Sequence, residues 1–373
     1  MRFSAIPGLS EEKSLLLEAT SSNHIAHAQL FVGTDGALNL PLALAFATYV
    51  HCEKKSADDS CGTCPACSKN DKLIHPDTHF VFPLSNVKGD KDEERFKAEI
   101  MKSWRSFLTE QPFGNLDDWT NYYGGEDKQA LISREESREI IKTLSLKPFE
   151  SRYKVMIIWQ PELMHPSAAN GILKILEEPA PHTFFILVTN AADKLLPTII
   201  SRTQIVTIPL LRDDEVEQTL IERYATEPGR ASRIAHLAEG NINYAIKFID
   251  SEEDNNSQRF TEWMRACFRK SYGALVTMAE EYHALDKLSQ KNLMAYGINM
   301  MREALLKVSG PTMNRSRGEE LKFIQDFSKV MDLEKIEKTY TLMNDASYHL
   351  ERNGSAKMIF LDVSLKLSRT INP

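Results

Sequence analysis

The 373-residue sequence lacks the features that would place it in a membrane or make it a nucleic-acid-binding protein on its own. Its longest apolar run, residues 40–50, contains Pro41 and is much shorter than the roughly 18 residues of a membrane span. No secretory signal pattern opens the chain, so we expect a cytoplasmic protein with no membrane partner. With 45 Lys and Arg against 52 Asp and Glu, the formal charge is −7. An acidic chain is poorly suited to gripping nucleic acid alone, although a local basic face could contribute within a complex.

Cysteine is also scarce, and four of the five cysteines lie in one short stretch, at positions 52, 61, 64 and 67 (Cys52, Cys61, Cys64 and Cys67). In a cytosolic protein, such clustering favours a metal site, with paired disulfides as the alternative. Four thiolates complete a tetrahedral shell around Zn²⁺ and leave no position for a substrate. The spacing therefore predicts a structural zinc module at about 52–67, and Cys267 is expected to be a core thiol.

Two apolar runs, 155–158 and 183–189, flank a helical stretch at 167–178. Strand, helix and strand over about 40 residues is a βαβ unit, which builds a parallel sheet with helices on its faces. In a nucleotide-hydrolysing protein of this kind, the first strand ends in Asp-Glu, where one carboxylate binds Mg²⁺ and the other activates water. Here Trp159 and Gln160 stand at those positions, so the scaffold indicates an ATPase whose chemistry is missing.

A second part of an ATP site is missing near the start of the chain. A short apolar strand at 30–32 is followed by a glycine-bearing turn and an apolar helix, the setting of a phosphate-binding loop. A working loop reads G-x-x-x-x-G-K-[ST], with lysine on the β- and γ-phosphates and the hydroxyl on Mg²⁺. Aligned on Gly33, the second glycine becomes Leu38, the lysine becomes Asn39 and the hydroxyl becomes Leu40. ATP is therefore not expected to bind productively.

The remaining segments are organised differently. Residues 84–130, which we call the insertion, are charged and aromatic, and their function is not evident from the sequence. From Arg212 onward the pattern is helical throughout. A polar stretch at 250–258 is predicted to be a linker, and residues 258–373 show apolar positions at helical spacing.

Two quoted stretches carry a family resemblance: P-S-A-A-N-G-I-L-K-I-L-E-E-P-A-P-H-T-F-F-I-L-V-T-N and the following L-L-P-T-I-I-S-R-T. They resemble bacterial DNA polymerase III clamp-loader subunits of the AAA+ class, which include the hydrolysing gamma/tau subunit and the delta-prime subunit. The losses at the loop and at the strand end are common in delta-prime subunits. Asn243 also stands where the hydrolysing subunit's G-x-x-R-D-A pattern has a phosphate-sensing arginine. Delta-prime is therefore the better match.

The resemblance implies three domains: an AAA+ domain at 1–210 that includes the zinc module and the insertion, a helical lid at 211–250, and a helical collar at 258–373. It implies a non-hydrolysing subunit of a five-membered ring that loads the sliding clamp onto primer-template DNA in replication. The implied partners are the gamma/tau and delta subunits of the clamp loader. The chain would contact the sliding clamp and primer-template DNA through the assembled complex. Arg202, in Ser201-Arg202-Thr203, would be an arginine finger offered to the ATP of a neighbouring subunit.

Two alternatives remain. An active gamma/tau-like ATPase would need Asn39 and Gln160 to replace lysine and glutamate, which Mg²⁺-dependent ATP binding would reveal. A stand-alone zinc protein that binds nucleic acid would need a basic stripe, but Lys54 and Lys55 lie beside Glu53 and Asp58 in a mixed field.

Overall fold

The computed structural model describes residues 1–373 except 23–24, 86–92, 126–128, 145–146, 251–252, 286, 310–317, 352–353 and 373. The chain forms two compact units, Met1–Ile246 and Lys247–Pro373. None of the helices within the described ranges combines the length and the apolar character that crossing a bilayer requires. The predicted division into three domains stays a prediction.

The first unit is built on a five-stranded sheet in the order β2-β3-β4-β1-β5. Every neighbouring pair of strands is parallel. The strands are β1 (Ala28–Val32), β2 (Thr78–Val81), β3 (Lys154–Trp159), β4 (Thr183–Thr189) and β5 (Gln204–Thr207). All six residues of β3 are buried, as expected for a central parallel strand covered on both faces.

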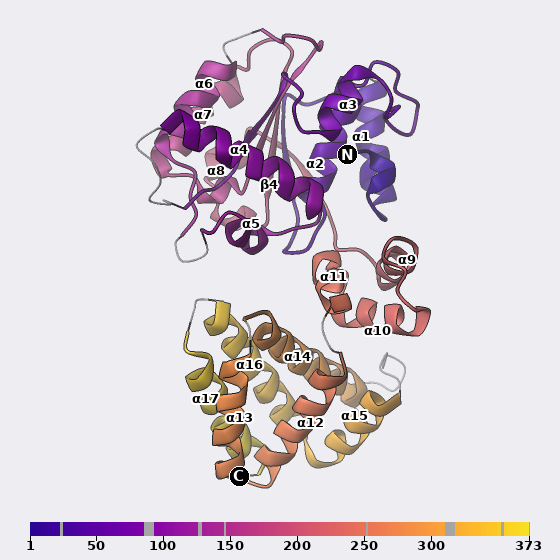
Figure 1. Ribbon diagram of the computed structural model, residues 1–373, viewed down its shortest axis with the longest axis vertical. Helices are drawn as coiled ribbons and strands as arrows, with labels where there is room; N and C mark the ends of the chain where they lie inside the picture. The colour runs from indigo at the N-terminus through magenta and orange to yellow at the C-terminus, as the bar shows by residue number, and fades with distance from the viewer. Residues whose placement is uncertain are drawn as a thin grey trace. The chain divides into compact units, whose positions relative to one another are not determined.

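Helices cover both faces of this sheet, as Figure 1 shows. On one face lies α2 (Asn39–His51), whose Phe46 ring contacts Phe31 of β1. On the other face lie α6 (Arg134–Leu144), α7 (Pro166–Glu177) and α8 (Pro197–Ile200). Buried side chains of these helices, including Ile172 and Ile199, pack with Leu30 and Met156 in one hydrophobic cluster. The α/β fold with helices on both faces is thereby confirmed.

Shorter elements complete the first unit. They are η1 (Phe3–Ala5), α1 (Ser10–Ser21), α3 (Pro65–Asp71), α4 (Glu93–Glu110), α5 (Leu116–Tyr122), η2 (Pro161–Leu163) and η3 (Ala192–Lys194), followed by α9 (Asp213–Tyr224), α10 (Pro228–Ala238) and α11 (Ile242–Asp250). We call α9–α11 the three-helix segment; the last residues of α11 belong to the second unit.

The insertion contains the helices α4 and α5, which share an aromatic cluster. The Trp104 ring stacks on Phe82 with 4.2 Å between ring centroids and meets Trp119 edge-on at 4.9 Å. The indole nitrogen of Trp119 donates to the carbonyl oxygen of Pro83 at 3.0 Å. Because Trp104 and Trp119 are almost fully buried against Phe82, the described part of the insertion shares an aromatic core with the end of β2.

The second unit is helical throughout its described residues. Its helices are α12 (Glu253–Phe268), α13 (Tyr272–Ala284), α14 (Lys287–Ser309), α15 (Gly318–Val330), α16 (Leu333–Glu351) and α17 (Ala356–Ile371). Phe360 of α17 stacks between Trp263 and Tyr282, with ring centroids 4.4 and 4.6 Å away. Cys267 is fully buried here, which agrees with a core thiol.

One boundary differs from the sequence prediction. Residues 250–258 were expected to form a polar linker, but α12 begins at Glu253, so most of that stretch is helical. Acidic residues are favourable in the first turn of a helix because they face the positive end of its dipole. A polar stretch of this kind is therefore also compatible with the start of a helix.

Candidate functional site

The residues predicted to form a degenerate nucleotide site lie where three neighbouring strands end. The loop that starts at Gly33 follows β1, Trp159 ends β3 and Thr189 ends β4. Since β3, β4 and β1 are adjacent and parallel, their carboxyl ends meet at one edge of the sheet, which is where ligands bind in open α/β proteins. The structure therefore brings together the loop and the strand end that the sequence pointed to.

Asn39 stands at the lysine position of the loop and is buried, with 3% of its surface exposed. Its Nδ2 donates to the carbonyl oxygen of Thr189 at 2.9 Å and to Oδ1 of Asn190 at 2.8 Å. Its Oδ1 accepts a hydrogen bond from the backbone of Leu40 at 3.1 Å. Leu38 and Leu40 are buried as well. The side chain that should reach a phosphate instead ties the start of α2 to the end of β4.

Glu162 is a member of this site that the sequence analysis missed. Its carboxylate accepts hydrogen bonds from the Thr189 hydroxyl at 2.8 Å and from the Asn190 backbone at 3.3 Å. Burial raises the pKa of Glu162 above its ordinary value. The only signal in the sequence was its place three residues after Trp159. Glu162 and Asn39 thus hold the same end of β4 from two sides.

Trp159, at the position of the Mg²⁺-binding aspartate, packs against the insertion. Its ring centroid lies 5.2 Å from that of Trp104 on α4. Only 3% of its surface is exposed. The adjacent Gln160 is also buried and has a left-handed backbone, with φ of 56°. The strand end therefore serves as a packing surface for the aromatic cluster of the insertion.

Asn243, at the position of the phosphate-sensing arginine, also contacts the insertion. Its Nδ2 donates to Oδ2 of Asp118 at 2.7 Å and to the carbonyl oxygen of Phe113 at 2.9 Å. A further contact links the loop to the turn before α11. Gly36 has φ of +85°, and a Cβ built there would lie 2.1 Å from Cγ of Asn241. The loop and the insertion therefore both contact the three-helix segment.

Arg202, the predicted finger, lies just after α8, and 30% of its side chain is exposed. Its Nε donates to Oε1 of Glu177 at 2.7 Å, and Nη2 donates to the same oxygen. Its Nη1 donates to the carbonyl oxygen of Thr198 at 2.8 Å. The guanidinium is therefore partly exposed and held by its own subunit; its role toward a neighbour stays a prediction.

The four clustered cysteines converge as a metal site requires. Their sulfur atoms all lie within 4.8 Å of one another, and those of Cys61 and Cys67 are 3.9 Å apart. With Zn–S bonds of about 2.3 Å, tetrahedral geometry separates the sulfurs by roughly 3.8 Å. Cys52 follows α2, whereas Cys64 and Cys67 lie at the start of α3. The donor set could hold a metal ion, and Zn²⁺ fits it.

Backbone amides donate to the sulfurs of Cys52, Cys61 and Cys64, whereas burial raises the pKa of Cys52 and of Cys67. The Cys61 amide donates to Cys52 Sγ at 3.2 Å, and the Cys67 amide donates to Cys64 Sγ at 3.4 Å. Hydrogen bonds from the Thr63 amide and hydroxyl and from the Cys64 amide lower the pKa of Cys61 to about 6. A thiolate is the form that binds a metal.

The loop between Cys52 and Cys61 also holds the first residues of the chain in place. The carboxylate of Asp59, in this loop, accepts hydrogen bonds from the backbone amides of Phe3 and Ser4.

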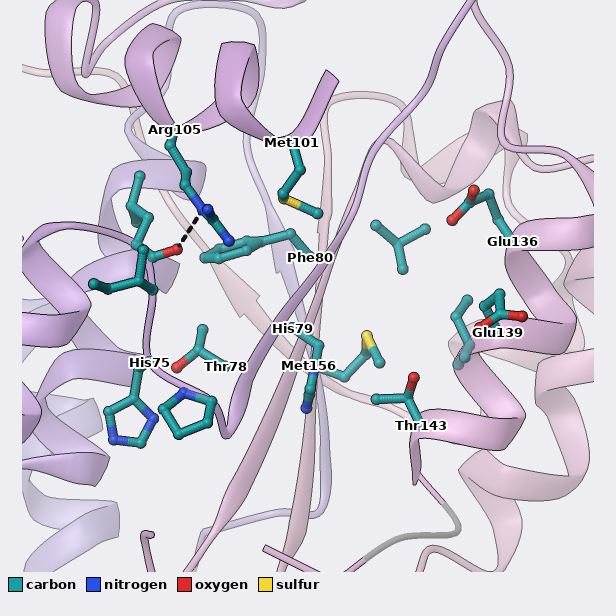
Figure 2. A pocket seen from close by; sticks show the side chains of 15 residues that line it. His75, Thr78, His79, Phe80, Met101, Arg105, Glu136, Glu139, Thr143 and Met156 are labelled. Atoms are coloured by element: carbon teal, nitrogen blue, oxygen red, sulfur yellow. Dashed lines mark hydrogen bonds between the residues drawn. The ribbon is translucent and has the colours of Figure 1, made fainter. Parts of the chain in front are cut away.

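A separate cavity of about 380 Å³ lies beside the edge strand β2, between α4 and α6 (Figure 2). Its polar lining has charges of both signs, with Arg105 on α4 and Glu136 and Glu139 on α6. Nε of Arg105 donates to the carbonyl oxygen of Leu73 at 3.0 Å. The residues predicted for the nucleotide and zinc sites are absent from the described lining, so this cavity is not part of the candidate site.

A known family and several known proteins resemble this chain over part of its length. Residues 9–212, more than half of the chain, match the family described as DNA polymerase III, delta subunit. The DNA polymerase III subunit delta' of Bacillus subtilis is 29% identical over 240 residues, covering 64% of this chain and 58% of that protein. The DNA polymerase III subunit gamma of Buchnera aphidicola is 23% identical over 253 residues, covering 66% of this chain and 58% of that protein. The chain thus matches less than two thirds of the length of these relatives.

Among solved structures, a DNA polymerase III gamma subunit-related protein from Thermotoga maritima overlaps 95% of this chain and 100% of its own. The overlap is loose, with a TM-score of 0.39 and 15% identity. The family match over residues 9–212 carries the assignment. The chain belongs to the DNA polymerase III delta-subunit family, with delta-prime and gamma/tau subunits of clamp loaders among its relatives.

Proposed function

We propose that this chain is a non-hydrolysing, delta-prime-type subunit of a DNA polymerase III clamp loader, and therefore a pseudo-ATPase and not an enzyme. The observation that carries the proposal is that the side chain of Asn39 has a structural role within the chain. The amide at the position of the essential lysine is buried and bonded to Thr189 and Asn190. A neutral, internally bonded side chain offers no charge to a β- or γ-phosphate.

Two further positions support the same reading. A hydrolysing subunit needs a carboxylate for Mg²⁺ and a sensing arginine, and these positions hold Trp159 and Asn243. Both side chains are engaged with the insertion, through Trp104 and Asp118. Both side chains make structural contacts instead, which supports the absence of hydrolysis rather than a divergent active site.

The proposed contribution to ATP hydrolysis is made in trans. Arg202 would act as an arginine finger that completes the ATP site of an adjacent gamma/tau subunit. A cation delivered across an interface makes hydrolysis depend on assembly, and such fingers contribute roughly 10³–10⁵ to the rate. The position of Arg202 at the surface of the first unit, with 30% of its side chain exposed, supports this role.

The proposal also covers the metal and the partners. The cysteine cluster would hold one structural Zn²⁺ through Cys52, Cys61, Cys64 and Cys67, and a closed four-sulfur shell stabilises structure without catalysing a reaction. The partners would be gamma/tau and delta subunits, with the sliding clamp and primer-template DNA reached through the complex. Residues 1–210 would serve as the nucleotide-binding-like domain, residues 211–250 as the lid and residues 258–373 as the collar.

The deciding experiment measures ATP hydrolysis by a ring reconstituted from this chain and its cognate gamma/tau and delta subunits, with clamp and primed DNA. Arg202→Ala should slow the site that faces this chain by about 10³-fold or more, so the ring loses that site's share of turnover. The matched control is Arg212→Ala, because Arg212 is 70% exposed and pairs with Asp214 on its own helix. An Arg202→Ala ring that assembles and hydrolyses ATP like wild type would contradict the finger.

Titrations of the isolated chain separate the alternatives. Mg²⁺-dependent ATP binding in the micromolar range or tighter would favour an active gamma/tau-like ATPase. Salt-dependent binding of DNA by the isolated chain would favour a stand-alone nucleic-acid-binding protein. We expect neither.

A further inference from the structure

The guanidinium of Arg202 is held along one edge by a single carboxylate. Nε and Nη2 both donate to Oε1 of Glu177, and Nη1 donates to the carbonyl oxygen of Thr198 at 2.8 Å. These bonds use three of the five N–H donors of the arginine. One donor of Nη2 remains, and the second donor of Nη1 makes a 3.4 Å hydrogen bond to the Ser201 hydroxyl, the longest of the bonds to this guanidinium. A phosphate that displaces this hydroxyl would meet two neighbouring nitrogens, which match two of its oxygens.

Rigid elements hold the two partners. Glu177 ends α7 and Arg202 follows α8, and these helices pack against each other. The residue before Glu177, Leu176, is fully buried, and Ile199 of α8 belongs to the same hydrophobic cluster. The carboxylate is therefore presented from a packed helix end, while 49% of its own side chain remains exposed. An exposed ion pair adds little to folding stability, so stability alone does not explain this contact.

We propose that Glu177 is a positioning residue for Arg202, fixing the guanidinium so that Nη2 can donate to an incoming phosphate and Nη1 can exchange its long bond to Ser201 for a second phosphate oxygen. This inference rests on the proposed function, in which Arg202 acts on the ATP of a neighbouring subunit. An unheld arginine samples many rotamers, and ordering it only during the reaction lowers the rate. Glu177 would order the side chain before the neighbour arrives.

The test uses the full chain in the reconstituted ring with clamp and primed DNA, and measures kcat and KM for ATP. Glu177→Ala should lower kcat at the site facing Arg202 by about 10- to 100-fold and leave KM nearly unchanged. Glu177→Gln should keep most of the rate, because its amide oxygen can accept the same two hydrogen bonds. Glu178→Ala is the matched control, since Glu178 is the adjacent exposed carboxylate.

Four other outcomes would contradict the proposed role of Glu177. A Glu177→Ala ring that is faster than wild type would mean that Glu177 restrains Arg202, and the inference would be wrong. Unchanged turnover in Glu177→Ala, with a loss in Arg202→Ala, would overturn the inference and leave the proposed function standing. Unchanged turnover in Arg202→Ala would overturn the proposed function and the inference with it. Equal losses in Glu177→Gln and Glu177→Ala would also contradict positioning by hydrogen bonds.

Discussion

Asn243 donates a 2.7 Å hydrogen bond to Asp118, and this bond joins the three-helix segment to the insertion. Oδ2 of Asp118 also accepts a hydrogen bond from the backbone of Asn115, which caps α5. Trp159 meets the same insertion through Trp104. Trp159 and Asn243, the two positions that the sequence predicted to have lost nucleotide chemistry, are therefore contacts of the insertion. Through them the insertion links the end of β3 to the three-helix segment.

Asn243→Ala should weaken the attachment of the three-helix segment. The change leaves the carbonyl oxygen of Phe113 and the Asp118 carboxylate without this donor, which typically costs about 1–3 kcal/mol. Hydrogen–deuterium exchange should rise in α9 and α10 while the sheet stays protected. Asn344→Ala is the control, because the Asn344 amide donates to the carbonyl oxygen of Tyr340 within its own helix. Equal exchange in both variants would show that the bond does not hold the segment.

Strands β3 and β4 were predictable because each is a short apolar run bounded by polar residues. The runs expected at 155–158 and 183–189 became β3 and β4, and the glycine turn led into α2 as predicted. The cysteine cluster was predictable because its spacing is local. The partners of Trp159 and Asn243 were not, since they lie in a distant insertion whose local pattern does not identify its contacts. Nothing in the sequence indicated the bond between Glu177 and Arg202.

Loss of one cysteine should remove the metal and loosen the start of the chain. We expect about one zinc per purified chain, measured by elemental analysis, and a large loss in Cys64→Ser, because a three-thiolate shell binds zinc more weakly. In Cys64→Ser, hydrogen–deuterium exchange should also rise at the backbone amides of Phe3 and Ser4. These amides donate to Asp59, which lies in the loop between Cys52 and Cys61. Cys267→Ser, which changes a buried thiol of the second unit, should keep the metal. Zinc retained at wild-type level in Cys64→Ser would contradict the site.

His79 should make the first unit sensitive to acid. Burial, followed by the charge of Lys154, lowers the pKa of His79 from 6.5 to about 4. Figure 2 shows this side chain on β2 beside Met156 and Thr143, and its Nε2 is buried. His79 binds a proton more readily in the unfolded chain than in the folded one. The free energy of unfolding is therefore highest above pH 6.5 and falls by up to ~3 kcal/mol as the pH drops toward 4.

Denaturant unfolding across this pH range isolates the effect of His79. His79→Gln should lose less stability than wild type between pH 6.5 and 4, because the titrating group is gone. The exposed His349 provides the control variant His349→Gln, whose pH dependence should follow wild type. Parallel curves for His79→Gln and wild type would exclude His79 as a source of the acid sensitivity.

Restoring the loop lysine alone should damage the fold without creating an ATPase. Asn39→Lys removes the bonds to Thr189 and Asn190 and places a cation where only 3% of the residue is exposed. Asn39→Ala removes the same bonds without adding charge and should cost about 1–3 kcal/mol, and the lysine variant should lose more because an unpaired charge is buried. Denaturant unfolding of both variants separates the two contributions.

The Asn39→Lys variant should also fail to bind ATP tightly in an Mg²⁺-ATP titration. A working loop has a glycine directly before the lysine, and this chain has the buried Leu38 at that position. Micromolar binding by a stable Asn39→Lys chain would mean that the loop is still shaped for phosphate and that hydrolysis was lost at the strand end alone.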